Sequence, residues 1–303
     1  MSDDTTMRPI TPKGLRPRPR PCPRWPIAGL IPLLVLPLAG AARAAIDPLA
    51  DLDDACWEES FVDEFDTLRL EADGGPWKPG YLWPADVIIN DEEQYYVDPG
   101  ALRHSPFSVA DGVLSIRAEP TPAAIRAHVE GQPYVSGVLT TENGFSQRHG
   151  RFEAILQPPA GRGLWSAFWL LPSFDSWPEG VAVLPEIDVM EFIGDQPRTL
   201  HTTLHTNQNG TLESHPYDHA VDAEPSAGFH RYSVVWTEQA VHWYLDRRHL
   251  VSHPTPADYT RPVHFLLNLA VGGSWPGSPD GTTPFPALYR VDSVRAFTES
   301  GRC

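Results

Sequence analysis

Short segments in which apolar and polar side chains alternate recur along most of the chain. This alternation has a period of two, which places successive side chains on opposite faces of a β-strand. Clusters of Gly, Pro, Asp and Asn separate the segments, and this spacing predicts a β-sandwich or a β-barrel. The predicted strands cover residues 60–65, 112–118, 135–141, 150–157, 200–206, 230–237, 241–246, 264–270 and 289–297.

The helical period of 3.6 residues is nearly absent from the chain. Residues 121–129 have the pattern of one short helix, which Pro122 and Gly131 confine. No internal repeat, low-complexity linker or second domain boundary interrupts the rest. The sequence therefore predicts one all-β domain, a sandwich of two antiparallel sheets, over residues 45–303.

Residues 1–44 differ from the rest in charge and hydropathy. They hold seven Lys or Arg and two acids, a net charge of +5, whereas the remaining 259 residues have a net charge of −21. Their basic run is followed by an apolar stretch, residues 27–42, and a small-x-small exit that ends at Ala44. These are the parts of a secretory signal peptide, and the stretch is short for a membrane anchor of about 20 residues. We expect cleavage near Ala44, secretion to the extracellular space or periplasm, and no membrane association of the mature domain.

Net charge and cysteine content exclude further classes. A formal charge of −16 argues against a nucleic-acid partner, which requires a basic face. Three cysteines are too few for a disulfide-dense scaffold, and Cys22 leaves with the signal peptide. Export places Cys56 and Cys303 in an oxidising compartment, so we predict one disulfide between them, with two unpaired thiols as the alternative.

Three acids interrupt an otherwise apolar predicted strand, PEIDVMEFIG at residues 185–194. Glu186 and Asp188 are two residues apart and share a face, while Glu191 would point the opposite way in a regular strand. A β-bulge near residues 189–190 adds one residue and returns Glu191 to the first face. The sequence therefore predicts three carboxylates on one surface.

Carboxylates at such short range disfavour one another's ionisation, so the pKa of at least one is raised. A retaining glycosidase uses this pairing, because an ionised carboxylate attacks the anomeric carbon while a protonated one donates to the leaving oxygen. The two groups lie about 5–5.5 Å apart for retention and about 6.5–9.5 Å apart for inversion, and neighbours on one strand suit the shorter distance. A calcium site and a solvated strand face are the alternatives. Calcium loops are richer in Gly and Asn than this strand, and tryptophans upstream offer sugar-stacking faces.

The motif resembles the centre of glycoside hydrolase family 16, whose pattern is E-[ILV]-D-x-[ILMV]-E, and within it the laminarinase-type endo-β-1,3-glucanases. The resemblance implies a jelly-roll sandwich with a substrate cleft across its concave face. It implies that Glu186 is the nucleophile, Asp188 the assisting carboxylate and Glu191 the general acid/base. Further matching segments follow in family order at residues 62–66, 90–96, 149–154, 161–172, 229–236, 241–246 and 267–297.

The same resemblance implies further ligand contacts. No cofactor is needed for the chemistry, but a structural Ca²⁺ on the convex side would be bound by the Asp292 carboxylate and the carbonyls of Gly112 and Glu64. Tryptophan rings near the acids would carry sugar rings. The candidate substrate-binding residues are Trp165, Trp169, Asn90, His205, Asn268 and Trp275.

The expected function is endo-acting hydrolysis of a β-1,3-glucan polysaccharide by a monomeric enzyme, with transglycosylation as an open variant. Mixed-linkage β-1,3-1,4-glucan is the second candidate substrate. Agarose and carrageenan come last, and the acidic mature chain would repel a sulfated polymer. The alternative from another class is a non-catalytic β-glucan-binding protein on the same sandwich, which typically lacks one or both catalytic glutamates.

Two other enzyme classes fit the sequence poorly. A serine hydrolase needs a G-x-S-x-G elbow before a helix, and the nearest string, at residues 272–276, lacks that spacing. Two histidine pairs have the four-residue spacing of a zinc-binding helix, but their segments resemble strand and loop. These pairs are His201 with His205 and His215 with His219.

Overall fold

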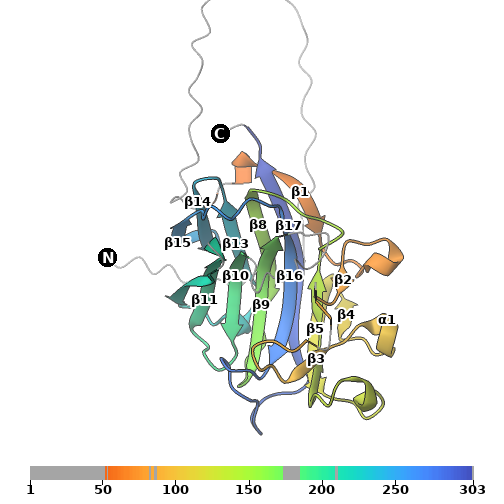
Figure 1. Cartoon of the computed structure of the whole chain (residues 1–303). Coiled ribbons are helices and arrows are strands. Elements are labelled where there is room, and N and C mark those ends of the chain that lie inside the picture. The colour runs from red at the N-terminus through yellow and green to blue at the C-terminus, as the bar shows by residue number, and fades with distance from the viewer. Residues whose placement is uncertain are drawn as a thin grey trace, which may run out of the picture.

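The computed structural model describes residues 52, 54–81, 83–84, 87–172, 185–208 and 211–301. Two twisted β-sheets pack face to face and form a sandwich (Figure 1). The predicted all-β fold with two sheets is confirmed. The predicted signal peptide and Cys303 lie outside the described residues.

The larger sheet has ten strands, and its neighbours are antiparallel except for one parallel pair at its end, β3 with β6. Eight strands lie in one row, while β1 pairs with β17 and β4 with β5. In spatial order the row is β15 (Arg248–Pro254), β14 (Ala240–Leu245), β13 (His230–Trp236), β8 (Gly150–Gln157), β17 (Ala287–Glu299), β5 (Val113–Pro120), β6 (Tyr134–Ser136) and β3 (Gln94–Tyr96), with β1 (Trp57–Asp63) and β4 (Phe107–Ala110) off it.

The smaller sheet has seven antiparallel strands and carries the acidic segment near its middle. One edge of this sheet is β12, an exposed and polar strand that contains Pro216. The spatial order is β12 (Glu213–Ala220), β11 (Thr199–Thr206), β10 (Glu186–Ile193), β9 (Leu164–Pro172), β16 (Val263–Val271), β7 (Val138–Thr140) and β2 (Lys78–Pro79).

Helices contribute little to the described residues. The predicted helix over residues 121–129 is wrong apart from a 3-10 turn, because main-chain and side-chain bonds from Thr121 tie this segment into a loop between β5 and β6. None of the described helices is long and apolar enough to cross a membrane. They are α1 (Pro99–Leu102) and 3-10 turns at Asp54–Cys56, Glu71–Asp73, Arg126–His128 and Pro225–Ala227.

The hydrophobic core lies between the two sheets and is rich in aromatic rings. Phe265 of β16 contacts Phe152 of β8 edge to face, with ring centroids 5.7 Å apart, so the contact joins the sheets. Phe265 also stacks on Phe168 of the adjacent strand β9. This packing fixes the smaller sheet against the larger one, so the opposite face of the smaller sheet is left to line a cleft.

Candidate active site

Strand β10 contains a β-bulge at the acidic motif. Its register shifts against both neighbouring strands after Asp188. Against β9, Asp188 faces Trp169 while Met190 already faces Phe168, so Val189 is the extra residue. The bulge predicted at residues 189–190 is confirmed.

The bulge reverses the side-chain alternation once within the strand. Val189 and Met190 both join the hydrophobic core, although they are consecutive. Glu186, Asp188 and Glu191 consequently line one cavity of about 830 Å³ on the other face of the sheet. A regular strand with this sequence would bury Glu191 in the apolar core, where its charge would be uncompensated.

All nine residues predicted for catalysis and substrate binding line this cavity. Sequence reasoning missed an aromatic pair in its lining, in which the Tyr81 and Trp83 rings stack with centroids 4.2 Å apart. It also missed Glu92, a buried acid of the cavity wall, and Thr203, which contacts an acid directly. The sequence did contain a signal for this pair, because Tyr81 and Trp83 are two aromatic residues close together in a segment that is bounded by Pro84.

Two of the predicted sugar-binding residues hold each other in place. The Trp169 indole Nε1 donates to Asn268 Oδ1 at 2.8 Å, and the Asn268 amide donates to the Tyr96 hydroxyl at 3.0 Å. Trp169 is only 7% exposed. In contrast, Trp275 is 43% exposed and packs edge to face on Trp165, with ring centroids 5.1 Å apart. Trp165 and Trp275 therefore offer the accessible aromatic surface beside the acids.

Glu191 has the environment of a protonated acid. Its side chain is buried and receives hydrogen bonds from two neutral donors, Trp165 Nε1 at 3.1 Å and Thr203 Oγ1 at 3.3 Å. Burial and, secondarily, the negative charge of Glu186 raise the pKa of Glu191 to about 8, while the two hydrogen bonds oppose this rise. This environment favours the protonated form of Glu191.

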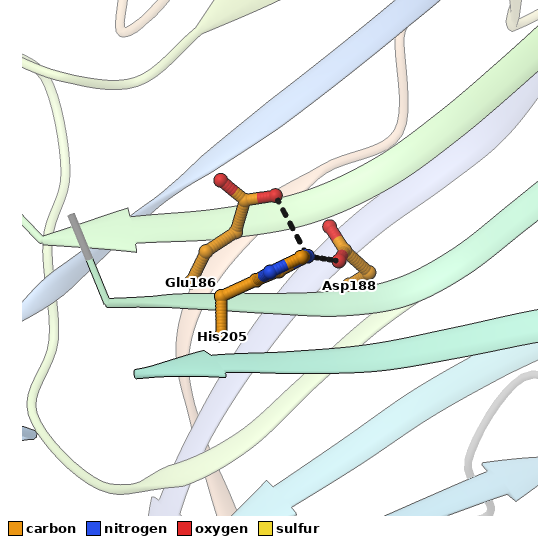
Figure 2. A group of neighbouring side chains, drawn as sticks. All are labelled: Glu186, Asp188 and His205. Atoms are coloured by element: carbon orange, nitrogen blue, oxygen red, sulfur yellow. Dashed lines mark ion pairs between the residues drawn. The ribbon is translucent and has the colours of Figure 1, made fainter. Parts of the chain in front are cut away.

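Glu186 lies beside the only described histidine that faces two of the three acids (Figure 2). The His205 Nε2 atom lies 3.1 Å from Asp188 Oδ2 and 3.8 Å from Glu186 Oε1. Burial and the charge of Asp188 raise the pKa of Glu186 well above its usual range, and His205 lowers it. Burial and the charge of Glu191 raise the pKa of Asp188 as well. Of the two glutamates, Glu186 is thus the one that lies beside an imidazole.

A metal ion has one candidate group among the described residues, in which the donor atoms of Glu186, Asp188 and His205 lie within 4.8 Å of one another. The 3.1 Å contact from His205 to Asp188 already fits an ion pair, and no step below requires a metal. The histidine spacings considered in the sequence do not form a helical zinc motif. Residues four apart on a strand such as β11 are separated by about 13 Å.

The predicted calcium ligands are brought together on the larger sheet. Strand register places Asp292 of β17 beside the β4–β5 turn that contains Gly112 and beside the end of β1, just before Glu64. A carboxylate and main-chain carbonyls are suitable Ca²⁺ ligands. The Glu64 carboxylate forms an ion pair with Arg295, and the role assigned to Glu64 uses its carbonyl instead. The residues fit a structural Ca²⁺, and the site stays a prediction.

The C-terminal end of the described chain lies near Cys56, one of the two cysteines of the predicted disulfide. The Ser300 amide donates to the Cys56 carbonyl at 2.8 Å, so the C-terminal strand passes beside Cys56. Cys303 lies outside the described residues, and the bridge stays a prediction.

Fold and site together define a class, since a β-sandwich with an acid-lined, aromatic cleft is the architecture of a polysaccharide hydrolase. The sequence profile described as "Glycosyl hydrolases family 16" matches residues 107–291, and the chain belongs to this family. The predicted jelly-roll architecture is confirmed by likeness to solved laminarinases of the family.

Several relatives of the chain are named as β-glucanases or β-glycanases. The endo-1,3-1,4-beta-glycanase EglC of Rhizobium meliloti is 39% identical over 255 residues, which cover 82% of this chain and 53% of the relative. The chain thus spans about half the length of that protein. The beta-glucanase of Rhodothermus marinus is 34% identical, with coverages of 80% and 85%. The endo-beta-1,3-glucanase structure from Pyrococcus furiosus is 30% identical with a TM-score of 0.67, and covers 80% of this chain and 95% of that one.

Proposed function

We propose that this protein is a retaining endo-glycosidase that hydrolyses β-1,3-glucan through a covalent glycosyl-enzyme. One observation carries the proposal: a single bulged strand presents Glu186, Asp188 and Glu191 to the same cleft, with His205 beside Glu186 and two neutral donors on Glu191. A retaining glycosidase needs two neighbouring carboxylates of this kind, one as the nucleophile and one as the acid.

In the first step, a Glu186 oxygen attacks the anomeric carbon while the bond to the leaving glycosidic oxygen breaks. Glu191 donates its proton to that oxygen, so the departing sugar leaves as an alcohol. Glu186 acquires a covalent bond to the sugar, and Glu191 is left as a carboxylate. Asp188 lies between them on the same face of the strand, where His205 contacts it and the nucleophile.

In the second step, the ionised Glu191 removes a proton from water. The water oxygen forms a bond to the anomeric carbon as the ester bond to Glu186 breaks. Glu186 regains its charge and Glu191 its proton. Two inversions at one carbon retain the β configuration, and capture by a sugar hydroxyl in place of water gives transglycosylation.

β-1,3-Glucan is the leading substrate, supported by the laminarinase-like motif and the structural neighbours named above. Mixed-linkage β-1,3-1,4-glucan is the second candidate, because the relative with 39% identity bears the name of a 1,3-1,4-glycanase. A cavity of about 830 Å³ on a sheet face can bind an internal stretch of a polymer chain, which favours endo action. A secreted protein would meet such a polymer outside the cell.

The test is the product profile on laminarin, lichenan and agarose, read by reducing-sugar release and by NMR of the first product. We expect oligosaccharides from laminarin, fewer from lichenan and none from agarose, with the β anomer formed first. Initial α anomer would contradict retention. Binding to laminarin without release from any of the polymers would favour the non-catalytic glucan-binding alternative.

Substitution of His205 is expected to change the pH dependence of activity. The positive charge of a protonated His205 lowers the pKa of Glu186, so the His205→Asn variant is expected to have a higher Glu186 pKa. Because activity needs ionised Glu186, the acid limb of kcat/KM should move to higher pH while the alkaline limb stays in place.

The matched control for this prediction is His219→Asn. His219 lies on β12 and contacts Thr202 at 3.0 Å, outside the residues that line the cavity. Its variant should keep the wild-type profile. An acid limb that is unchanged in His205→Asn would remove His205 from the mechanism.

A further inference from the structure

The carbonyl of Asp188, at the start of the bulge, receives a hydrogen bond from the opposite sheet. Trp243 of strand β14 is fully buried, and its indole Nε1 donates to this oxygen at 2.9 Å through the core. We propose that Trp243 is a positioning residue that holds the β10 bulge in the register presenting Glu191 to the cleft. The inference rests on the proposed function for its kinetic readout.

A bulge disturbs the hydrogen-bond ladder, and a buried carbonyl next to it needs a donor from elsewhere. The register against both β9 and β11 changes immediately after Asp188. A slip by one residue would exchange the faces of the side chains that follow, and Glu191 would turn toward the core. A bond to the Asp188 carbonyl acts at the residue where such a slip would begin.

Other contacts hold strand β10 on either side of the bulge, and the bond from Trp243 lies between them. Before the bulge, the Tyr259 hydroxyl lies 2.6 Å from the carbonyl oxygens of both Glu186 and His205 and can donate to either, which ties the start of β10 to β11. After the bulge, side-chain donors hold the Glu191 carboxylate. Trp243 contacts the main chain between these two regions, and a rigid indole transmits the position of β14 to the bulge.

The chain contains a matched control. Trp236 lies on the adjacent strand β13 and is as fully buried as Trp243. Its indole Nε1 has no hydrogen-bond partner in the described part of the chain. Trp236→Phe and Trp243→Phe therefore remove the same volume from the core, and only Trp243→Phe removes a hydrogen bond to the catalytic strand.

The experiment compares both variants on laminarin. We expect Trp243→Phe to lower kcat by about 10- to 100-fold with little change in KM, because a small displacement of the acid impairs proton transfer without removing sugar contacts. Trp236→Phe should retain kcat within about threefold of wild type, although both cavities lower the melting temperature. Hydrogen exchange should speed up at the Met190 and Glu191 amides in Trp243→Phe alone.

Equal kcat values and equal exchange rates in the two variants would overturn the proposal. If Trp243→Phe fails to fold, 3-benzothienylalanine at position 243 keeps the ring shape and replaces N–H by sulfur, and the same loss of kcat is expected. An inactive wild-type protein would instead refute the proposed function. The exchange comparison would then still decide whether Trp243 holds the bulge.

Discussion

The Glu186→Gly variant is expected to lose hydrolysis of laminarin almost completely, by about 10⁴-fold or more in kcat, as when a nucleophile is removed from other covalent enzymes. The carboxylate forms the covalent bond, and no other described group faces the cleft in its position. Its side chain is 25% exposed and lies on the cleft face, so glycine opens no cavity in the core. The measurement is the initial rate of reducing-sugar release, with the melting temperature as a folding control.

Azide provides the control for this assignment. With an aryl β-glycoside whose leaving group needs no protonation, azide can occupy the space left in Glu186→Gly and attack the anomeric carbon once. The product is then an α-glycosyl azide, formed with one inversion, as the aryl oxide leaves. A β-glycosyl azide would place the missing group on the acid/base side and contradict the role of Glu186.

The Glu191→Gln variant has the second largest expected effect. Glutamine keeps the shape of the side chain but has no proton to donate, so kcat on laminarin should fall by about 10²- to 10⁴-fold. Wild-type activity requires protonated Glu191, whose raised pKa is about 8, and should therefore decline as pH rises through that value. In Glu191→Gln this alkaline limb should vanish, because the group that titrates there is gone.

A leaving group that needs no protonation separates this role from a general loss of structure. With such an aryl glycoside, the first step of Glu191→Gln should stay close to the wild-type rate, and the glycosyl-enzyme should accumulate because water is not activated. Mass spectrometry would detect the adduct on Glu186. An alkaline limb retained near pH 8 would assign that limb to another residue.

Most of the sheet structure was predictable because apolar and polar residues alternate along a strand that is buried on one face. Predicted strands at residues 150–157 and 200–206 agree with β8 and β11 to within one residue. The edge strand β12 was missed because it is polar on both faces and contains a proline, so no apolar alternation marks it. Strand β3 is three residues long and pairs in parallel with β6, a contact that depends on chain folding rather than on local pattern.

The candidate site was predictable where its acids conflict with the regular side-chain alternation of a β-strand. Three acids in an apolar strand demanded a bulge, and the bulge followed from the spacing alone. The partners that tune the acids were not predictable in the same way. Thr203 and Trp243 reach the acidic motif from other strands, and nothing in their own segments distinguishes them from ordinary core residues.

Strand β12 is an open sheet edge whose residues oppose the addition of another strand. An open sheet edge can add a strand from another molecule, which is a route to aggregation. Here the edge carries Pro216, which has no N–H to donate, and the charged side chains Glu213 and Asp218, both exposed. The border of the smaller sheet is therefore a poor template for another strand. Because Pro216 also lines the cavity, one residue both shapes the cleft wall and keeps neighbouring molecules from extending the sheet.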